Sequence, residues 1–266
     1  MNGDTAIQSL TLLCAWSVLL QTLEYWRIAD SVAPTGVWSW PVQRADIPNT
    51  SPKLKHVLDW AYQPSVYRAQ LLMRGLAALA LALWGANLGV ALVLFVGQLL
   101  LLVRWRGAFN GGSDFMTLVA LSGILMAQVL ALFIDPAMAW AAGLGYIGIQ
   151  TLSSYFVSGW VKVKRAEWRS GRALTVFLNT GLYGPLPPGS VFRQPVVAFV
   201  CSWAFMLWEG VFPLVLFKPD WVWVFGGMAL LFHFLVFWFF GLNRFFWAWA
   251  TNLSSLFFLS SVISSY

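Results

Sequence analysis

Charged side chains are scarce in this sequence. Lys, Arg, Asp and Glu make up 10% of its 266 residues, while 59% are hydrophobic. Ordinary soluble domains carry roughly 25% charged residues. A water-soluble core could not bury so much apolar surface in a chain of this length. The composition therefore excludes an ordinary soluble domain and indicates that the chain is embedded in a lipid bilayer.

Cysteine and cofactor-binding motifs are also scarce. Both cysteines, Cys14 and Cys201, lie in long apolar runs, so no disulfide framework or C-x-x-C metal site is available. The sequence has no glycine pattern of the Rossmann or P-loop type and no pair of histidines at metal-ligand spacing. No internal repeat or soluble domain is visible. We therefore predict a single transmembrane domain over residues 1–266, without a metal site.

Long apolar runs are what the sequence does contain. A helix needs about 20 apolar residues to cross the hydrocarbon, and it pairs its backbone polar groups internally. Eight segments qualify, which predicts an all-α transmembrane bundle. They are residues 5–23, 69–86, 88–103, 115–133, 137–161, 194–217, 221–241 and 244–265. The second and third share one apolar run split at residues 85–87, so a re-entrant hairpin is an alternative for them.

The basic residues predict the orientation of these helices. The net charge is +6, and 14 of the 16 Lys and Arg residues fall in the first, third, fifth and seventh loops, when Arg244 at the start of the eighth span is counted with the seventh loop. Only Lys218 lies in the other loops, and Arg74 lies within a span. Because basic loops mark the cytoplasmic side, this bias supports eight spans with both termini outside. We expect a bacterial inner (cytoplasmic) membrane protein whose partners are membrane lipids rather than nucleic acid.

Three ionisable side chains lie within predicted spans, where a charge costs about 2.5–3.5 kcal/mol on insertion scales. Arg74 lies about one turn into its helix, so we expect it to snorkel to the headgroups. Glu209 and His233 lie deeper on adjacent helices and could approach one another. Two interpretations stay open for this pair: a contact that fixes helix packing, or a pair that handles protons or orients a substrate.

Polar residues also gather on two stretches that should meet the same membrane face. Residues 104–114 lead into the fourth span, and residues 159–171 leave the fifth. The side chains of interest on them are Asn110, Asp114, Lys162, Lys164 and Trp168. By composition alone, a basic helix end beside tryptophan is most often an anchor for lipid headgroups.

A family resemblance adds a second interpretation. Residues 159–171, written G-x-x-K-x-x-x-x-x-W-x-x-G, resemble the signature of the HTTM domain, the membrane domain shared with vitamin K-dependent gamma-carboxylase. The E-x-x-x-P of residues 209–213 and the H-x-x-x-x-x-x-x-G-L-N of residues 233–243 resemble later helices of that family. The polar residues 110–114 stand where the family carries a polar segment before a helix. Together the likeness covers most of the chain.

The resemblance implies roles for particular residues. In the carboxylase, a lysine of the signature is held to deprotonate vitamin K hydroquinone. By motif register that role falls on Lys162, with Lys164 as the alternative, and the implied cofactor is a vitamin K-like quinone. Glu209 and His233 would position the substrate or relay protons. The pocket would be lined by Asn110, Asp114, Lys164 and Trp168. We expect a short form of the family, without the carboxylase's luminal domain.

Three classes of function stay open at this stage. The first is an HTTM-like enzyme, a carboxylase-like lyase or epoxidase that acts on a lipid quinone. The second is a non-enzymatic membrane subunit or assembly partner of a larger complex, which the absence of a soluble domain and of cofactor motifs supports. A transporter ranks last, because few polar residues lie within the spans and no inverted repeat is evident.

Overall fold

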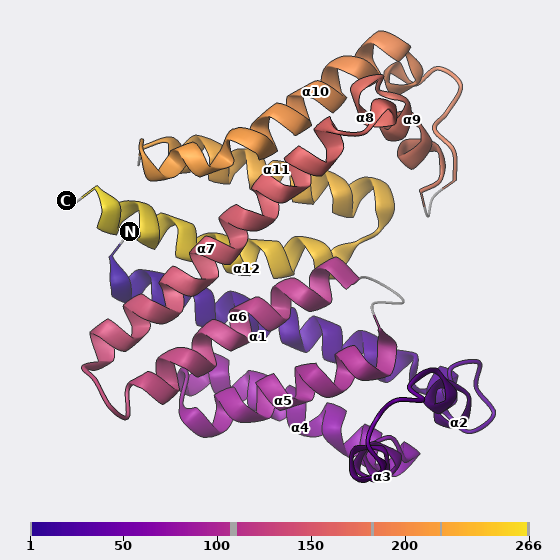
Figure 1. Cartoon of the computed structure of the whole chain (residues 1–266), viewed down its shortest axis with the longest axis vertical. Helices are drawn as coiled ribbons and strands as arrows, with labels where there is room; N and C mark the ends of the chain where they lie inside the picture. The colour runs from indigo at the N-terminus through magenta and orange to yellow at the C-terminus, as the bar shows by residue number, and fades with distance from the viewer. Residues whose placement is uncertain (1, 107–110, 182–183, 219, 265–266) are drawn as a thin grey trace.

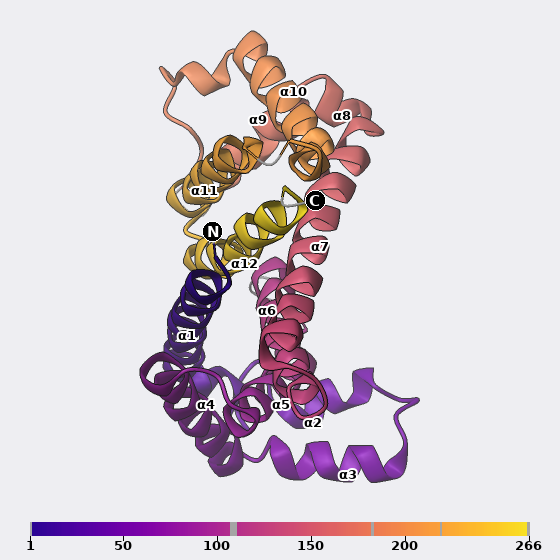
Figure 2. The same cartoon turned by 90° about the vertical axis from the view of Figure 1, so that its left-hand side faces the viewer.

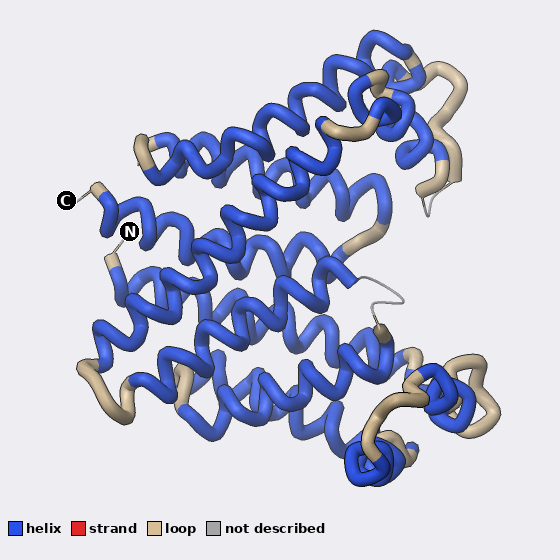
Figure 3. Tube along the Cα trace, viewed as in Figure 1, coloured by secondary structure: helices blue, strands red, loops and turns tan. Residues whose placement is uncertain are grey.

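The computed structural model describes residues 2–106, 111–181, 184–218 and 220–264, which form helices joined by loops with no strand among them (Figures 1 and 3). The predicted all-α bundle is therefore confirmed. The long helices are α1 (Gly3–Arg27), α4 (Pro64–Trp84), α5 (Leu88–Trp105), α6 (Gly111–Leu130), α7 (Pro136–Val163), α10 (Pro195–Val211), α11 (Trp221–Phe240) and α12 (Asn243–Ile263). A 3₁₀ segment, η4 (Phe212–Leu216), extends α10.

Seven helices of the described residues are long and apolar enough to cross a membrane: α1, α4, α5, α6, α10 with η4, α11 and α12. The chain is thus an integral, multi-pass membrane protein. The remaining long helix, α7, has 28 residues. Figure 1 shows that it runs from the side where α6 ends to the opposite side. The eight predicted spans are therefore confirmed by hydropathy for seven helices, and α7 follows the same course.

The second and third spans form two separate helices rather than a re-entrant hairpin. The helix α4 has 21 residues and α5 has 18. Gly85 adopts a positive φ of 77° at the end of α4, a conformation that glycine reaches without strain. The Asn87 side chain then accepts a hydrogen bond from the Val90 N–H (3.1 Å), which caps the start of α5.

The shorter helices lie on the side of the bundle opposite the two termini (Figure 1). Between α1 and α4 they are η1 (Ala29–Val32), α2 (Trp40–Gln43), η2 (Arg44–Asp46) and α3 (Pro52–Ala61). Between α7 and α10 they are α8 (Ala166–Arg169), α9 (Arg172–Asn179) and η3 (Val191–Arg193). Both clusters carry basic loop residues, so this side is called the basic face below. The two termini lie together on the other side, as an even number of crossings requires.

Buried apolar residues form two main clusters on either side of α7 and α12. One joins α1, α4, α5, α6 and α7, and the other joins α7, α10, η4, α11 and α12. Figure 2 shows the corresponding halves, with α12 between them and α7 running along the side of both. A Cβ on Gly143 of α7 would lie 2.6 Å from the Gly123 carbonyl oxygen of α6. The contact between α6 and α7 therefore requires a residue without a side chain.

Arg74 does not snorkel to the headgroups, contrary to the sequence prediction. It is 1% exposed, and its guanidinium lies inside the first half of the bundle. It donates hydrogen bonds to Gln21 Oε1 (3.0 Å) and Thr22 Oγ1 (2.7 Å) of α1 and to Gln98 Oε1 (2.6 Å) of α5. Since neighbouring helices supply these acceptors, the side chain has no need to reach the surface.

Candidate functional site

A cavity of about 480 Å³ lies in the second half of the bundle, bounded by α7, α8, α9, α10, α11 and α12. Its walls are mostly aromatic and aliphatic. The polar side chains among its lining residues are Ser154, Tyr155, Ser158, Lys162, Glu209 and His233. A mostly apolar cavity with a few convergent polar groups is the usual form of a small-molecule site.

Lys162 and Glu209 form a largely buried ion pair at this cavity. The Lys162 Nζ lies 2.6 Å from Glu209 Oε1 and 2.5 Å from Oε2. The side chains are 17% and 3% exposed, respectively. Ser158 lies one helical turn before Lys162: its Oγ accepts a hydrogen bond from Nζ (2.7 Å) and donates one to Glu209 Oε1 (3.3 Å). The Trp168 ring lies beside the ammonium, with its centroid 5.4 Å from Nζ.

His233 pairs with Tyr155 rather than with Glu209. The Tyr155 hydroxyl lies 2.7 Å from His233 Nε2, and the tautomer of the ring decides which group donates. The imidazole stacks on Trp249, with ring centroids 4.6 Å apart. Glu209 and His233 thus have different direct partners, although both line the same cavity.

Two glycines bring α7 and α8 against α10 and so assemble the ion pair. A Cβ on Gly159 would lie 2.6 Å from the Gly210 nitrogen of α10. Gly171 has a positive φ of 78°, and a Cβ there would lie 2.6 Å from the Phe199 nitrogen. Between these glycines, the Ser202 hydroxyl of α10 donates a hydrogen bond to the Trp168 carbonyl (2.6 Å). Both glycines of the sequence signature are therefore positions of close backbone approach.

The other predicted pocket residues lie in different places. Trp168 lines the cavity, but Lys164 does not belong to its lining: it is exposed, with its Nζ 4.9 Å from the Trp160 ring centroid. Asp114 lies in another polar cluster, where both of its carboxylate oxygens are 3.2 Å from the Tyr25 hydroxyl. Asn110 falls outside the described residues.

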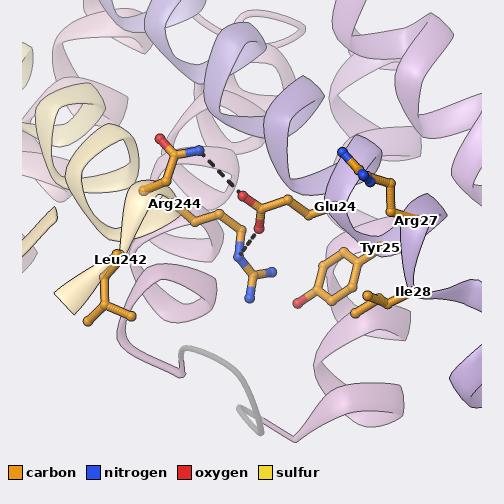
Figure 4. Close-up of a pocket in the computed structure, with 8 residues that line it drawn as sticks. Glu24, Tyr25, Arg27, Ile28, Leu242 and Arg244 are labelled. Atoms are coloured by element: carbon orange, nitrogen blue, oxygen red, sulfur yellow. Dashed lines mark hydrogen bonds and ion pairs between the residues drawn. The ribbon is translucent and has the colours of Figure 1, made fainter. Parts of the chain in front are cut away.

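That second cluster borders another cavity, of about 350 Å³, at the basic-face ends of α1 and α12 (Figure 4). Arg244 is 6% exposed and pairs with Glu24 (Nε to Oε2, 2.9 Å) and with Asp114 (Nη1 to Oδ1, 3.7 Å). In Figure 4, no interaction joins Arg27 to the Glu24–Arg244 pair. Sequence reasoning missed this cluster because Glu24 lies one residue beyond the first predicted span and Arg244 begins the eighth, where a charge is ordinarily solvated. Leu242 lines both cavities.

Neither a metal site nor a relative identifies this chain. Comparison with protein-family models, curated proteins and solved structures found no match. Within the described ranges, no three His, Cys, Asp or Glu side chains are grouped so that they could hold a metal ion. The functional argument therefore depends on the geometry of the cavity and its polar residues.

Proposed function

We propose that this chain is an HTTM-like enzyme of a bacterial inner membrane, which deprotonates a lipid quinol in the cavity beside Lys162 and Glu209. One observation carries the proposal: Lys162, Glu209 and His233, chosen from three separate sequence motifs, line a single cavity. The aromatic walls suit a flat ring. The bilayer would supply a lipid-soluble substrate directly.

The ion pair suggests how the proton would move. A paired ammonium and carboxylate are together neutral, and the pair can accept one proton. If Lys162 passes a proton to Glu209, the free amine can take the proton of a quinol hydroxyl. The pair then carries one positive charge, held by the ammonium, beside the negative quinolate oxygen. This charge would stabilise the anion in a site from which water is largely excluded.

His233 and Trp168 would position the ring rather than exchange its proton. Trp168 lies beside the Lys162 ammonium, and His233 is fixed by Tyr155 on one side and stacked on Trp249 on the other. Such rigid side chains would hold a bound quinol with its hydroxyl near the ion pair. Positioning of this kind contributes to catalysis by keeping the reacting groups in contact.

The experiment compares two lysines two residues apart. Purified protein in lipid nanodiscs would be given reduced menaquinone and oxygen, and quinol consumption and oxygenated products would be followed by chromatography. We expect Lys162→Ala to abolish turnover and Lys164→Ala to retain it, because only Lys162 lines the cavity. Gel filtration would establish that both variants are folded. Full turnover by folded Lys162→Ala would refute the role of this residue.

The hydrogen bonds of the Lys162 ammonium favour a second candidate function, that of a non-enzymatic membrane subunit. Its ammonium already bonds to Glu209 and Ser158, as a purely structural ion pair would. In that case the wild-type protein would show no quinol turnover, and a stoichiometric protein partner would co-purify with it in mild detergent. This result would replace the enzymatic proposal.

A further inference from the structure

The helix α3 presents an apolar face that the protein covers only in part. Leu58 and Ala61 are buried, at 6% and 2% exposure, in a cluster that also holds Trp40 of α2 and, partly buried, Leu100 of α5. Leu54 and Val57 lie on the same face of the helix but are 50% and 52% exposed. Two residues of the apolar stripe are therefore buried and two are about half exposed.

Hydrogen bonds hold the end of α3 at the depth where the neighbouring spans begin. Gln70, six residues into α4, donates from Nε2 to the Ala61 carbonyl (2.8 Å). The Tyr62 hydroxyl donates to the Leu100 carbonyl (2.8 Å), five residues before the end of α5. These anchors lie about 9 Å and about 7.5 Å inside the ends of the two spans, at a rise of about 1.5 Å per residue. The end of α3 thus lies at the level of the first two turns of α4 and the last two turns of α5.

The direction of α3 also suits a membrane surface. Figure 1 shows this helix end-on while the spans run across the view, and Figure 2 shows it at full length. It therefore runs crosswise to the spans, in the plane that a bilayer surface would occupy. Only Tyr62 and Gln63 separate it from α4, so it cannot move far from this level.

The charges of α3 complement an anionic lipid surface. Lys53 and Lys55 flank the exposed Leu54, and His56 lies on the polar side of the helix. The Lys55 ammonium donates one hydrogen bond to the Pro48 carbonyl (2.8 Å), which leaves two of its three N–H groups for other acceptors. A bidentate contact between Arg44 and Asp59 (2.7 and 2.9 Å) ties this polar side to the preceding segment. Amphipathic helices with lysines beside the apolar stripe bind anionic membranes through both features.

We propose that α3 is an in-plane membrane helix that inserts Leu54 and Val57 into the leaflet at the basic face, where Lys53 and Lys55 bind anionic phospholipid headgroups. This interaction is independent of the cavity at Lys162. It would fix the loop between α1 and α4 on the lipid surface.

Spin labels can test the insertion directly. Cysteines would be placed singly at Leu54, Val57 and His56 in a background carrying Cys14→Ala and Cys201→Ala, and the labelled protein reconstituted in nanodiscs of phosphatidylglycerol and phosphatidylcholine. We expect labels at 54 and 57 to be accessible to oxygen and shielded from a water-soluble nickel chelate. The label at 56 should show the reverse. Because all three share one background, effects of the cysteine replacements cancel.

Two outcomes would overturn the proposal. Equal nickel accessibility at 57 and 56 would show that the apolar face is in water. For the headgroup contact, the label at 57 should become less immersed when phosphatidylglycerol is omitted, and also when Lys53→Gln and Lys55→Gln are introduced together. Immersion that depends on neither the lipid charge nor the lysines would refute the binding of anionic headgroups.

Discussion

Gly159→Ala should force apart the two helices that hold the ion pair. The new Cβ would lie 2.6 Å from the Gly210 nitrogen and 2.9 Å from the Met206 carbonyl oxygen of α10. Both neighbours are backbone atoms, so they cannot rotate away. Reaching an ordinary separation of about 3.5 Å requires α7 and α10 to move apart by about 1 Å locally. Overpacking of this kind typically costs about 1–3 kcal/mol.

The assay is thermal unfolding in detergent, followed with a thiol-reactive dye that reports exposure of Cys14 and Cys201. Each kcal/mol should lower Tm by about 2–4 °C for a chain of this size. Gly145→Ala is the matched control, because it lies on the same helix and a Cβ there would meet nothing within 4 Å. We expect Gly145→Ala to match or exceed the wild-type Tm. Equal Tm values for the two variants would refute the close approach at Gly159.

Two further predictions concern single contacts. Tyr155→Phe should lower stability by about 1–3 kcal/mol, because the buried His233 loses its hydrogen-bond partner; an unchanged Tm would contradict this bond. The Arg44 guanidinium holds the pKa of the Asp59 carboxyl below its ordinary value. Their contact therefore stabilises the loop fully at pH values above about 3.9, the pKa of an aspartate carboxyl in the unfolded chain. That stabilisation should disappear as the pH falls through the lowered pKa, seen as rising mobility of a spin label at His56. In Asp59→Asn the mobility should be high at every pH.

Hydropathy predicted the fold because the bilayer imposes one requirement on every span. Each crossing needs a long apolar helix, and the loops between crossings carry most of the charge. The same reasoning failed for Arg74 because it considered only the helix that carries this residue. The acceptors that keep the guanidinium inside come from Gln21 and Gln98, on two other helices. A pattern within one segment contains no information about such partners.

A related reason explains why Glu209 and His233 do not form the direct contact that the sequence allowed. Residue counting estimates the depth of a side chain in the membrane, but it does not give the direction in which that side chain points. Both residues reach the same cavity, yet Glu209 meets Lys162 and His233 meets Tyr155. The rotation of each helix about its axis decides these partners, and it is set by packing against helices distant in the sequence.

The choice between Lys162 and Lys164 follows from helix geometry once one contact is known. Gly159 touches α10, and a residue three positions later lies on nearly the same face of α7. Lys162 therefore points toward α10 and its Glu209, whereas Lys164, two positions further, is turned by about 200°. Separating the helices at Gly159 would leave both charges of the pair poorly compensated in a low-dielectric site. Gly159, Lys162 and Glu209 should therefore behave as one unit, and their substitutions should not be additive in either stability or turnover.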